Sequence, residues 1–279
     1  MANPEAQKSD QTKPGSDPLT MAADMRDTNI MEMVNKAIRS RNVTLAFQPI
    51  VQSRRSDAVA FHEGLLRVMD PGGRVIPAKD FIETVESQET GRLLDCMALD
   101  LGLQELAAEP SLRLSINMSA RSIGYRKWSE VLENGLRDNP TLGERLILEI
   151  TESSAMVMPE IVVAFMKDLQ SKGISFAMDD FGAGFTSFRY LKDFYFDVLK
   201  VDGMFCKGVH RNPDNQVIIQ ALVSIAKHFD MFTVCESVET AEEAEYLARA
   251  GVDCLQGYYF GAPTIRPPWR PMPPESLSA

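Results

Sequence analysis

The chain has 279 residues, of which 44% are hydrophobic and 24% are charged, and this length can bury one large core or two small ones. Its formal net charge of −10 argues against a protein that binds polymeric nucleic acid, because such proteins present a basic surface to the phosphate backbone. The four cysteines include no CxxC pair, and the chain is long for a disulfide scaffold, so a reduced, cytoplasmic protein is expected.

The two ends of the chain differ in composition from its interior. Residues 1–25 are rich in polar residues and proline, and they predict disorder. An amphipathic helix is expected over 26–42, where it could contact a protein partner, and the proline-rich residues 266–279 predict an extended tail. No apolar run reaches the ~18 residues of a membrane span, so no membrane contact is expected. Residues 43–265 therefore form one predicted domain.

Strand-like and helix-like segments alternate through this domain. Apolar residues at helical spacing predict helices over 91–109, 160–173, 215–229 and 240–251. Thr240 is a candidate N-cap, and Gly173 and Gly251 are candidate C-caps. The predicted strands cover 43–50, 58–67, 112–117, 144–150, 174–179, 196–201, 231–236 and 252–256.

This alternation predicts an α/β fold, namely a modified (β/α)8 TIM-like barrel. Only residues 51–57 separate the first two strands, whereas a parallel crossover needs about a dozen residues or more. The first strand is therefore expected to run antiparallel. An open doubly wound sheet is the alternative, but no glycine-rich phosphate-binding fingerprint follows the first strand.

Polar side chains mark the carboxyl ends of seven successive predicted strands. In barrels of this kind the active site is built at those ends. A single carboxylate there is usually only solvated or salt-bridged, but a run of polar ends indicates a shared site. Alternation along a strand places Glu63 and Arg67 on one face, and it places Asn117 opposite Ile116. The polar residues are Glu63, Arg67, Asn117, Glu149, Asp179, Asp180, Lys200, Asp202, Glu236 and Gln256.

Crowded carboxylates indicate a metal site, because their mutual repulsion is costly unless cations neutralise it. The expected ligands are all oxygens, which suit Mg²⁺ or Mn²⁺, whereas zinc usually takes histidine or cysteine. His62 neighbours Glu63 and therefore points to the other face of its strand. The adjacent Asp179 and Asp180 could hold two ions if one carboxylate bridges them, with metals ~3.5–4 Å apart as in phosphoryl-group hydrolysis.

Eight short segments follow one another along the chain, reading AFQPIV, EGLLR, SINMSAR, LEITES, DDFGAGF, LKVD, CESVET and QGYYFGAP. In this order, over residues 43–263, they resemble the EAL-type cyclic-di-GMP phosphodiesterases. The resemblance implies a barrel with one antiparallel strand. It implies a hydrolase that opens cyclic di-GMP to linear pGpG with two Mg²⁺ or Mn²⁺ ions. It also implies a homodimer, whose contacts are coupled to the site through the glycine-containing loop after Asp180.

The resemblance also implies a role for individual residues. The metal ligands would be Glu63, Asn117, Glu149, Asp179 and Asp180, with Asp179 as the bridge. The catalytic residues would be Glu63, Lys200, which holds or deprotonates the attacking water, and Glu236, which acts at the second metal. Substrate contacts would come from Gln48, Arg67 and Gln256. The residues that anchor the loop would be Glu152, Asp202 and Glu239.

Four positions depart from the usual pattern of the family. Gly64 stands where alanine is usual, and Ala183 stands where threonine is common. Cys235 and Ser237 flank Glu236 in place of alanine and glycine. None of these changes removes a predicted ligand or the predicted lysine, so an active enzyme is expected, with a lower rate than is typical.

Two other functions fit part of the sequence. A non-catalytic cyclic-di-GMP receptor or scaffold would have the same fold, but the complete set of acidic residues argues against it. A barrel aldolase could use Lys200 as a Schiff base, although it would not need so many acids. Incubation with cyclic di-GMP and metal distinguishes the first alternative, and borohydride trapping distinguishes the second.

Overall fold

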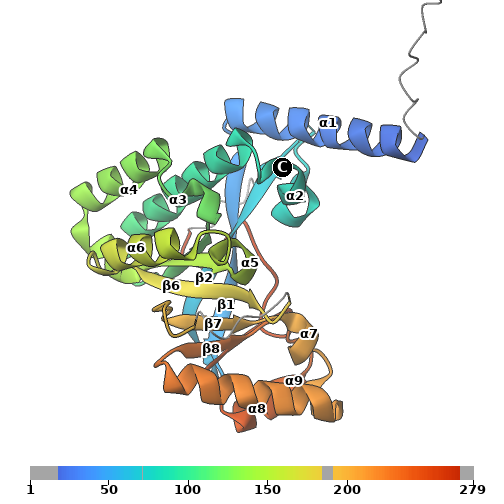
Figure 1. Cartoon of the computed structure of the whole chain (residues 1–279), viewed down its shortest axis with the longest axis vertical. Coiled ribbons are helices and arrows are strands. Elements are labelled where there is room, and N and C mark those ends of the chain that lie inside the picture. The colour runs from blue at the N-terminus through green and yellow to red at the C-terminus, as the bar shows by residue number, and fades with distance from the viewer. Residues whose placement is uncertain (1–17, 71, 184–190, 271–279) are drawn as a thin grey trace, which may run out of the picture.

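Eight strands close into a ring in the computed structural model, which describes residues 18–70, 72–183 and 191–270 (Figure 1). Around the ring the order is β1-β9-β8-β7-β6-β5-β4-β2, and β2 pairs again with β1. β1 is antiparallel to both neighbours, whereas the other pairs in the ring are parallel. The modified barrel with an antiparallel first strand is therefore confirmed. The strands are β1 (Val43–Gln52), β2 (Arg55–Met69), β4 (Leu114–Asn117), β5 (Leu146–Thr151), β6 (Ser175–Phe181), β7 (Val198–Val201), β8 (Phe232–Cys235) and β9 (Cys254–Gln256).

A hairpin replaces the first strand-helix-strand crossover. β1 and β2 pair with Gln48 opposite Glu63, so these two side chains lie on the same face of the sheet. A further short strand, β3 (Val75–Pro77), extends the hairpin and places Pro77 opposite Arg67. The sequence did not predict β3, because three residues are too few to show a periodic pattern.

Helices cover the outside of the ring (Figure 1). The four helices expected inside the domain correspond to α3, α6, α8 and α9, and the structure adds several short ones. Thr240 caps α9 through a capping box with Glu243, and Gly251 ends it in a left-handed conformation with φ of 89°. Among the described residues, no helix is both long enough and apolar enough to cross a membrane. The α-helices are α1 (Pro18–Arg39), α2 (Ile82–Val85), α3 (Glu89–Ala108), α4 (Arg126–Asp138), α5 (Glu152–Ala155), α6 (Pro159–Gln170), α7 (Gly203–Cys206), α8 (Pro213–His228) and α9 (Ala241–Ala250).

The N-terminal helix α1 lies across one end of the barrel (Figure 1). It begins at Pro18, earlier than the start at residue 26 that the sequence suggested, because proline is tolerated at the first helical position and the alanine and methionine residues that follow favour helix. Its second half packs through Val34 and Ala37 against Val68 and Phe81. Most of the predicted disordered segment, 1–17, lies outside the described residues, as does 271–279 of the predicted tail.

Alternation along the strands separates an outer from an inner apolar layer. The outer residues, such as Leu114 and Leu148, pack against the helices in the main core. The inner residues fill one end of the barrel interior and are named the apolar floor. The apolar floor consists of Ile50, Phe61, Ile147, Ala177, Val198, Val234 and Cys254.

A C-terminal strap, residues 264–270, covers the outer face of the hairpin that has no crossover helix. The Trp269 ring lies 5.1 Å from the ring of Phe47 and 4.7 Å from that of His62, measured between centroids. Its Nε1 donates a hydrogen bond to Glu105 Oε2 at 3.1 Å. His62 therefore faces outward, opposite to Glu63, as strand alternation predicts.

Replacing Trp269 with alanine is expected to lower the free energy of unfolding by roughly 2–3 kcal/mol. A fully buried tryptophan costs about 3–5 kcal/mol, and Trp269 is only partly buried. Urea denaturation followed by circular dichroism measures the change. Ile265→Ala is the matched control in the same strap, because Ile265 is 36% exposed, and a change within about 0.5 kcal/mol is expected. Equal effects of both variants would show that the strap does not depend on the Trp269 contact.

Candidate functional site

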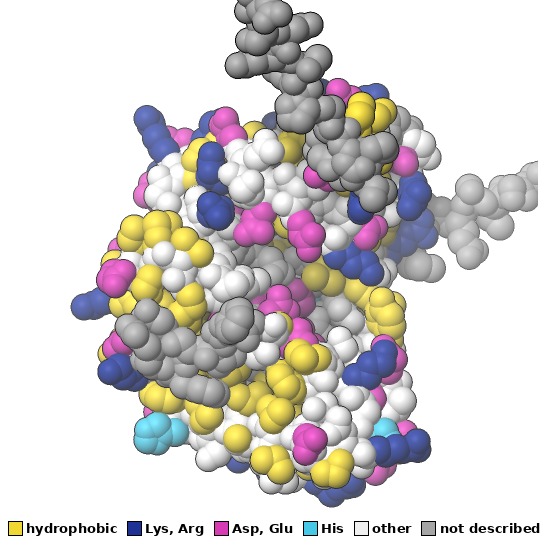
Figure 2. All heavy atoms as spheres, turned by 45° about the vertical axis from the view of Figure 1, so that its right-hand side comes forward, with side chains coloured by type: hydrophobic (Ala, Val, Ile, Leu, Met, Phe, Trp, Pro, Cys, Tyr) yellow, Lys and Arg dark blue, Asp and Glu magenta, His cyan; other side chains and the backbone are white. Residues whose placement is uncertain are grey.

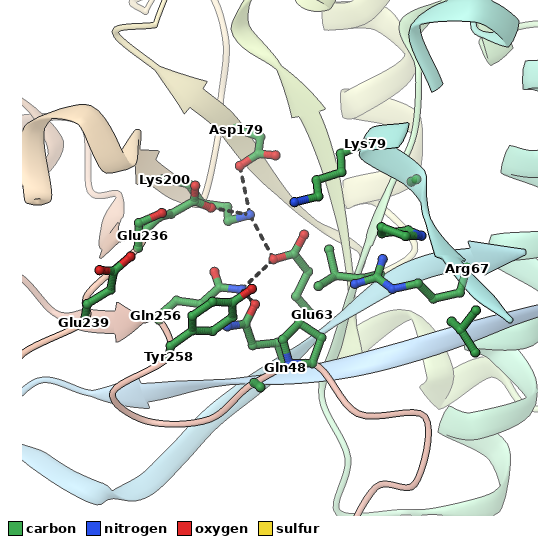
Figure 3. A pocket seen from close by; sticks show the side chains of 18 residues that line it. Gln48, Glu63, Arg67, Lys79, Asp179, Lys200, Glu236, Glu239, Gln256 and Tyr258 are labelled. Atoms are coloured by element: carbon green, nitrogen blue, oxygen red, sulfur yellow. Dashed lines mark hydrogen bonds and ion pairs between the residues drawn. The ribbon is translucent and has the colours of Figure 1, made fainter. Parts of the chain in front are cut away.

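A polar ring lies next to the apolar floor along the strands, and Figure 3 shows several of its side chains. Each of its residues stands two positions along its strand from a floor residue, so both side chains point inward. On β1 the polar residue precedes the floor residue, since that strand runs in the opposite direction. The polar ring consists of Gln48, Glu63, Glu149, Asp179, Lys200, Glu236 and Gln256, and Asn117 occupies the corresponding place on β4.

Lys200 is the centre of the polar ring. Its Nζ lies 2.6 Å from Glu149 Oε2, 2.8 Å from Asp179 Oδ1, 2.8 Å from Glu236 Oε1 and 3.3 Å from Glu63 Oε2. The side chain is only 1% exposed. Burial alone would lower the pKa of Lys200, but the four carboxylates outweigh burial and raise the pKa well above its usual value. A charged amine cannot attack a carbonyl group, so this geometry argues against the aldolase alternative.

Two amide side chains hold Glu63 in place, and a third, that of Gln48, holds one of them. Asn117 Nδ2 donates to Glu63 Oε1 at 2.8 Å, and Gln256 Nε2 donates to Glu63 Oε2 at 2.7 Å. Gln256 Nε2 also lies 3.2 Å from Gln48 Oε1, and Gln48 Nε2 donates to the carbonyl of Gly261. The fixed amides orient the Glu63 carboxylate toward Lys200.

The acids of the ring differ in their pKa values although they share one cation. Burial favours the neutral form of Glu63, but Lys200 and the hydrogen bonds from Gln256 and Asn117 bring its pKa below the usual value. Burial and the neighbouring Glu63 raise the pKa of Glu149 well above its usual value. Burial, with Asp179 and Glu63 nearby, also raises the pKa of Glu236 to about 8. More negative charge is gathered here than one lysine can neutralise.

The donor set fits hard divalent cations. Asp179, Asp180 and Glu236 each offer a carboxylate oxygen, and these oxygens all lie within 4.8 Å of one another. Glu149 Oε1 is buried and has no hydrogen-bond partner among the described residues, so it is open to a metal ion. Burial and the adjacent Asp179 raise the pKa of Asp180 to about 6, which a bound cation would reverse. All these donors are oxygens, as Mg²⁺ and Mn²⁺ prefer.

The three residues assigned to loop anchoring lie outside the polar ring. Glu152 Oε2 accepts a hydrogen bond from the backbone N–H of Gly182 at 3.2 Å, at the start of the loop. Asp202 caps α7, because its Oδ1 accepts a hydrogen bond from the N–H of Met204 at 2.7 Å. Glu239 pairs with the exposed Lys207 at 3.0 Å. The next loop residues, 184–190, lie outside the described residues.

A cavity of about 810 Å³ opens above the polar ring, and this size suits a small-molecule ligand. In the space-filling view, acidic side chains gather in the hollow near the middle of the face (Figure 2). Arg67 lines the cavity, together with Lys79 and Tyr258, which the sequence did not single out. Tyr258 belongs to the segment QGYYFGAP, so that motif could have indicated it. Lys79 follows a strand that carries no sequence signal.

Backbone strain accompanies two of the polar residues at this site. Asp180 and Ser237 adopt left-handed conformations, with φ of 54° and 57°. The side chain of Ser237 packs over Gly203, where an added Cβ would lie only 2.5 Å from the Ser237 Oγ. A glycine at position 237 would relieve this strain.

Replacing Ser237 with glycine is therefore expected to raise the free energy of unfolding by roughly 0.5–1 kcal/mol. The left-handed conformation costs an L-residue about 1–2 kcal/mol, and glycine's larger entropy in the unfolded chain offsets part of the gain. Thermal or urea denaturation measures the difference. Asp230→Gly is the control, because Asp230 has a φ of 56° and lies after α8, away from the cavity. Destabilisation by Ser237→Gly alone would mean that the hydroxyl makes a contact that outweighs the strain.

The sequence matches a family model and several curated relatives over most of its length. A family model described as the EAL domain matches residues 31–263. The relative named "Probable cyclic di-GMP phosphodiesterase PdeN", from Escherichia coli strain K12, is 30% identical over 232 residues, which are 81% of this chain and 44% of that protein. "Cyclic di-GMP phosphodiesterase PdeB" of Shewanella oneidensis is 29% identical over 234 residues, which are 82% of this chain and 27% of that protein. The chain thus spans less than half the length of these relatives.

Solved structures with the same architecture agree with the closed ring. The "PaMucR Phosphodiesterase, c-di-GMP complex" superposes with a TM-score of 0.73 and 26% identity, covering 85% of this chain and 97% of that chain. The FimX EAL domain from Pseudomonas aeruginosa bound to c-di-GMP has a TM-score of 0.77 over 85% of this chain and 97% of that one. Its identity is 22%, so this second likeness bears on the fold alone.

Proposed function

The chain belongs to the EAL domain family, and from this premise we propose that it is a cyclic-di-GMP phosphodiesterase. It would hydrolyse one phosphodiester bond of cyclic di-GMP and release linear pGpG. The relatives named for this activity are much longer proteins, so the proposal rests on this chain's own site.

One observation carries the proposal, namely the convergence of residues from separate strands at one end of the barrel. Glu63, Glu149, Asp179 and Glu236 all reach the Nζ of Lys200 within 3.3 Å, and Asn117 joins them through Glu63. A fold does not require so costly an arrangement of buried charge, because apolar residues of similar volume often give equal or greater stability. The arrangement therefore supports a chemical role.

Two divalent ions, Mg²⁺ or Mn²⁺, complete the proposed site. When bound, such ions lower the pKa of a coordinated water and stabilise charge on the phosphoryl oxygens. The buried, unpartnered Oε1 of Glu149 supports a metal between the inner ligands. The proposed ligands are Glu63, Asn117, Glu149 and Asp179 for one ion, and Asp179, Asp180 and Glu236 for the other, with Glu236 acting through water.

The residues of the chain would position the substrate and the attacking water. Lys200 stands at the centre of the polar ring with four carboxylates within 3.3 Å of its Nζ, so we assign it to hold or deprotonate the attacking water there. Gln256 lies beside Glu63 and would hold the same water from the β9 side. Arg67 offers forked donors to phosphate oxygens, and Gln48 offers an amide to a guanine edge.

Incubation with cyclic di-GMP and Mg²⁺ or Mn²⁺, followed by chromatography, tests the proposal. We expect pGpG to accumulate, and we expect EDTA to stop its formation. Tight binding of cyclic di-GMP without pGpG over several hours would instead favour the receptor alternative. Product formation that is insensitive to EDTA would refute the metal assignment.

The proposal extends to the assembly of the protein and to its cellular setting. We propose a homodimer, as EAL-type resemblance implies, and a protein partner for α1, whose Met21 and Met25 are 52% and 65% exposed. A cytoplasmic setting agrees with the four free cysteines. Light scattering on the purified protein measures the mass in solution, and a monomer at micromolar concentration would refute the dimer.

A further inference from the structure

The cavity above the polar ring has an acidic wall and a basic wall. Glu236 and Glu239 line one side, and Arg67 and Lys79 line the other (Figure 3). A cyclic dinucleotide carries two phosphodiesters, each with one negative charge. Recognition of such a dianion requires cations that remain free to contact it, so the availability of each lysine and arginine matters.

The other two cations that line the cavity already make contacts within the protein. Lys200 is 1% exposed and lies among four carboxylates, so it has little surface to offer a phosphate. Arg67 is partly buried and donates through Nη1 to the carbonyl of Leu66 at 2.8 Å. Lys79 is exposed, and its ammonium group makes no ion pair or hydrogen bond among the described residues. Lys79 is thus the cavity cation with the most unused binding capacity.

The backbone aims Lys79 into the cavity from the same side as Arg67. Pro77 of β3 pairs with Arg67, and Lys79 follows two residues later in the 3₁₀ turn Ala78–Asp80. Figure 3 shows the Lys79 side chain reaching toward Glu63 and Asp179 from the Arg67 side. A phosphate located between this basic wall and the acidic residues would therefore face the Lys79 ammonium.

We propose that Lys79 is a substrate-binding residue that contacts a phosphate oxygen of the cyclic dinucleotide together with Arg67. This inference rests on the proposed function, since it deepens the description of the same cavity. Lys79 lies on a short extension of the hairpin and not on a strand of the barrel. We therefore assign it to the affinity for the substrate and not to the chemical step. It would bind in the ground state and the transition state alike, and so act mainly on KM.

Kinetics of three variants test the assignment. Lys79→Gln is expected to raise KM for cyclic di-GMP about 10-fold with kcat changed less than 2-fold, as for the loss of one charged hydrogen bond. Lys79→Arg should restore most of the affinity. The rise in KM with added NaCl should be shallower for Lys79→Gln than for the unmodified protein, because one screened charge pair is gone. Arg74→Gln is the matched control, since Arg74 is exposed beside β3 but does not line the cavity.

Binding of a fluorescent cyclic-di-GMP derivative to the same proteins separates this inference from the proposed function. If the unmodified protein binds the derivative but does not hydrolyse cyclic di-GMP, the proposed phosphodiesterase activity is refuted. A higher Kd for Lys79→Gln would in that case still support the contact between Lys79 and the phosphate. If the unmodified protein neither binds nor hydrolyses, both proposals fail. If Lys79→Gln matches Arg74→Gln in KM and Kd, or lowers only kcat, the inference is wrong while the proposed function stands.

Discussion

Replacing Asp179 with asparagine is expected to lower the turnover of cyclic di-GMP by more than ~10²-fold, because even the outer partners of metal ligands cost 10–100-fold when lost. Asp179 is the proposed bridge between the two metal positions. Its Oδ1 lies 2.8 Å from Lys200, and its oxygens belong to the group formed with Asp180 and Glu236. The neutral amide keeps the shape but loses the charge that attracts a divalent cation. Steady-state assays over a range of Mn²⁺ concentration measure both the rate and the metal requirement.

The fold of this variant should survive. Asparagine is nearly isosteric, and three carboxylates remain to neutralise Lys200. Asp57→Asn is a suitable control, because the substitution removes the same charge. Asp57 is exposed and lies near the start of β2, six residues before Glu63. Near-normal hydrolysis by Asp179→Asn, with a normal metal requirement, would refute the site assignment.

The second large effect is expected at Lys200. In EDTA, Lys200→Met should lower the free energy of unfolding by about 3–5 kcal/mol, the usual cost of removing one partner of a buried ion pair. The variant leaves the carboxylates of Glu63, Glu149, Asp179 and Glu236 without their shared cation. Added Mg²⁺ or Mn²⁺ should restore part of this loss, because ions that bind only the folded state stabilise it by mass action. Urea denaturation with and without metal measures both effects.

Activity should fall together with this change in stability. Lys200→Met removes the proposed donor to the attacking water, so kcat should fall by about 10²-fold while substrate affinity changes less. Lys172→Met is the stability control, because the exposed Lys172 pairs with Asp168 on the surface and should cost less than about 1 kcal/mol. If metal does not affect the stability of Lys200→Met, the polar ring is not a metal site.

The positions of the strands could be predicted from the sequence because polar residues interrupt apolar segments at the strand ends. Glu63, Asn117, Glu149 and Asp179 stand beside buried residues of their strands, and side-chain alternation alone sends them inward. The antiparallel start followed from the length of 51–57, which is too short for a crossover. These inferences are local, and local rules suffice for them.

Other features depend on contacts between distant segments. The sequence places Lys200 among acidic strand ends, but only the closed ring shows that its Nζ contacts four carboxylates from other strands. The strap that places Trp269 on His62 joins residues far apart in sequence, so no periodicity could indicate it. Lys79 was missed for the same reason, since its place depends on the pairing of β3 with Arg67.

The closure of the ring by β1 and β9 has a consequence for synthesis. Within the ring, β1 is the first strand to be made, and its partner β9, at Cys254–Gln256, is the last. Until then, a nascent chain has one unpaired edge on β1 and lacks Gln256 beside Glu63. About 200 residues separate β1 from β9, and synthesis adds about 5–20 residues per second, so this edge stays exposed for roughly 10–40 seconds. A polypeptide that ends before β9 would therefore keep this edge unpaired and be prone to aggregate.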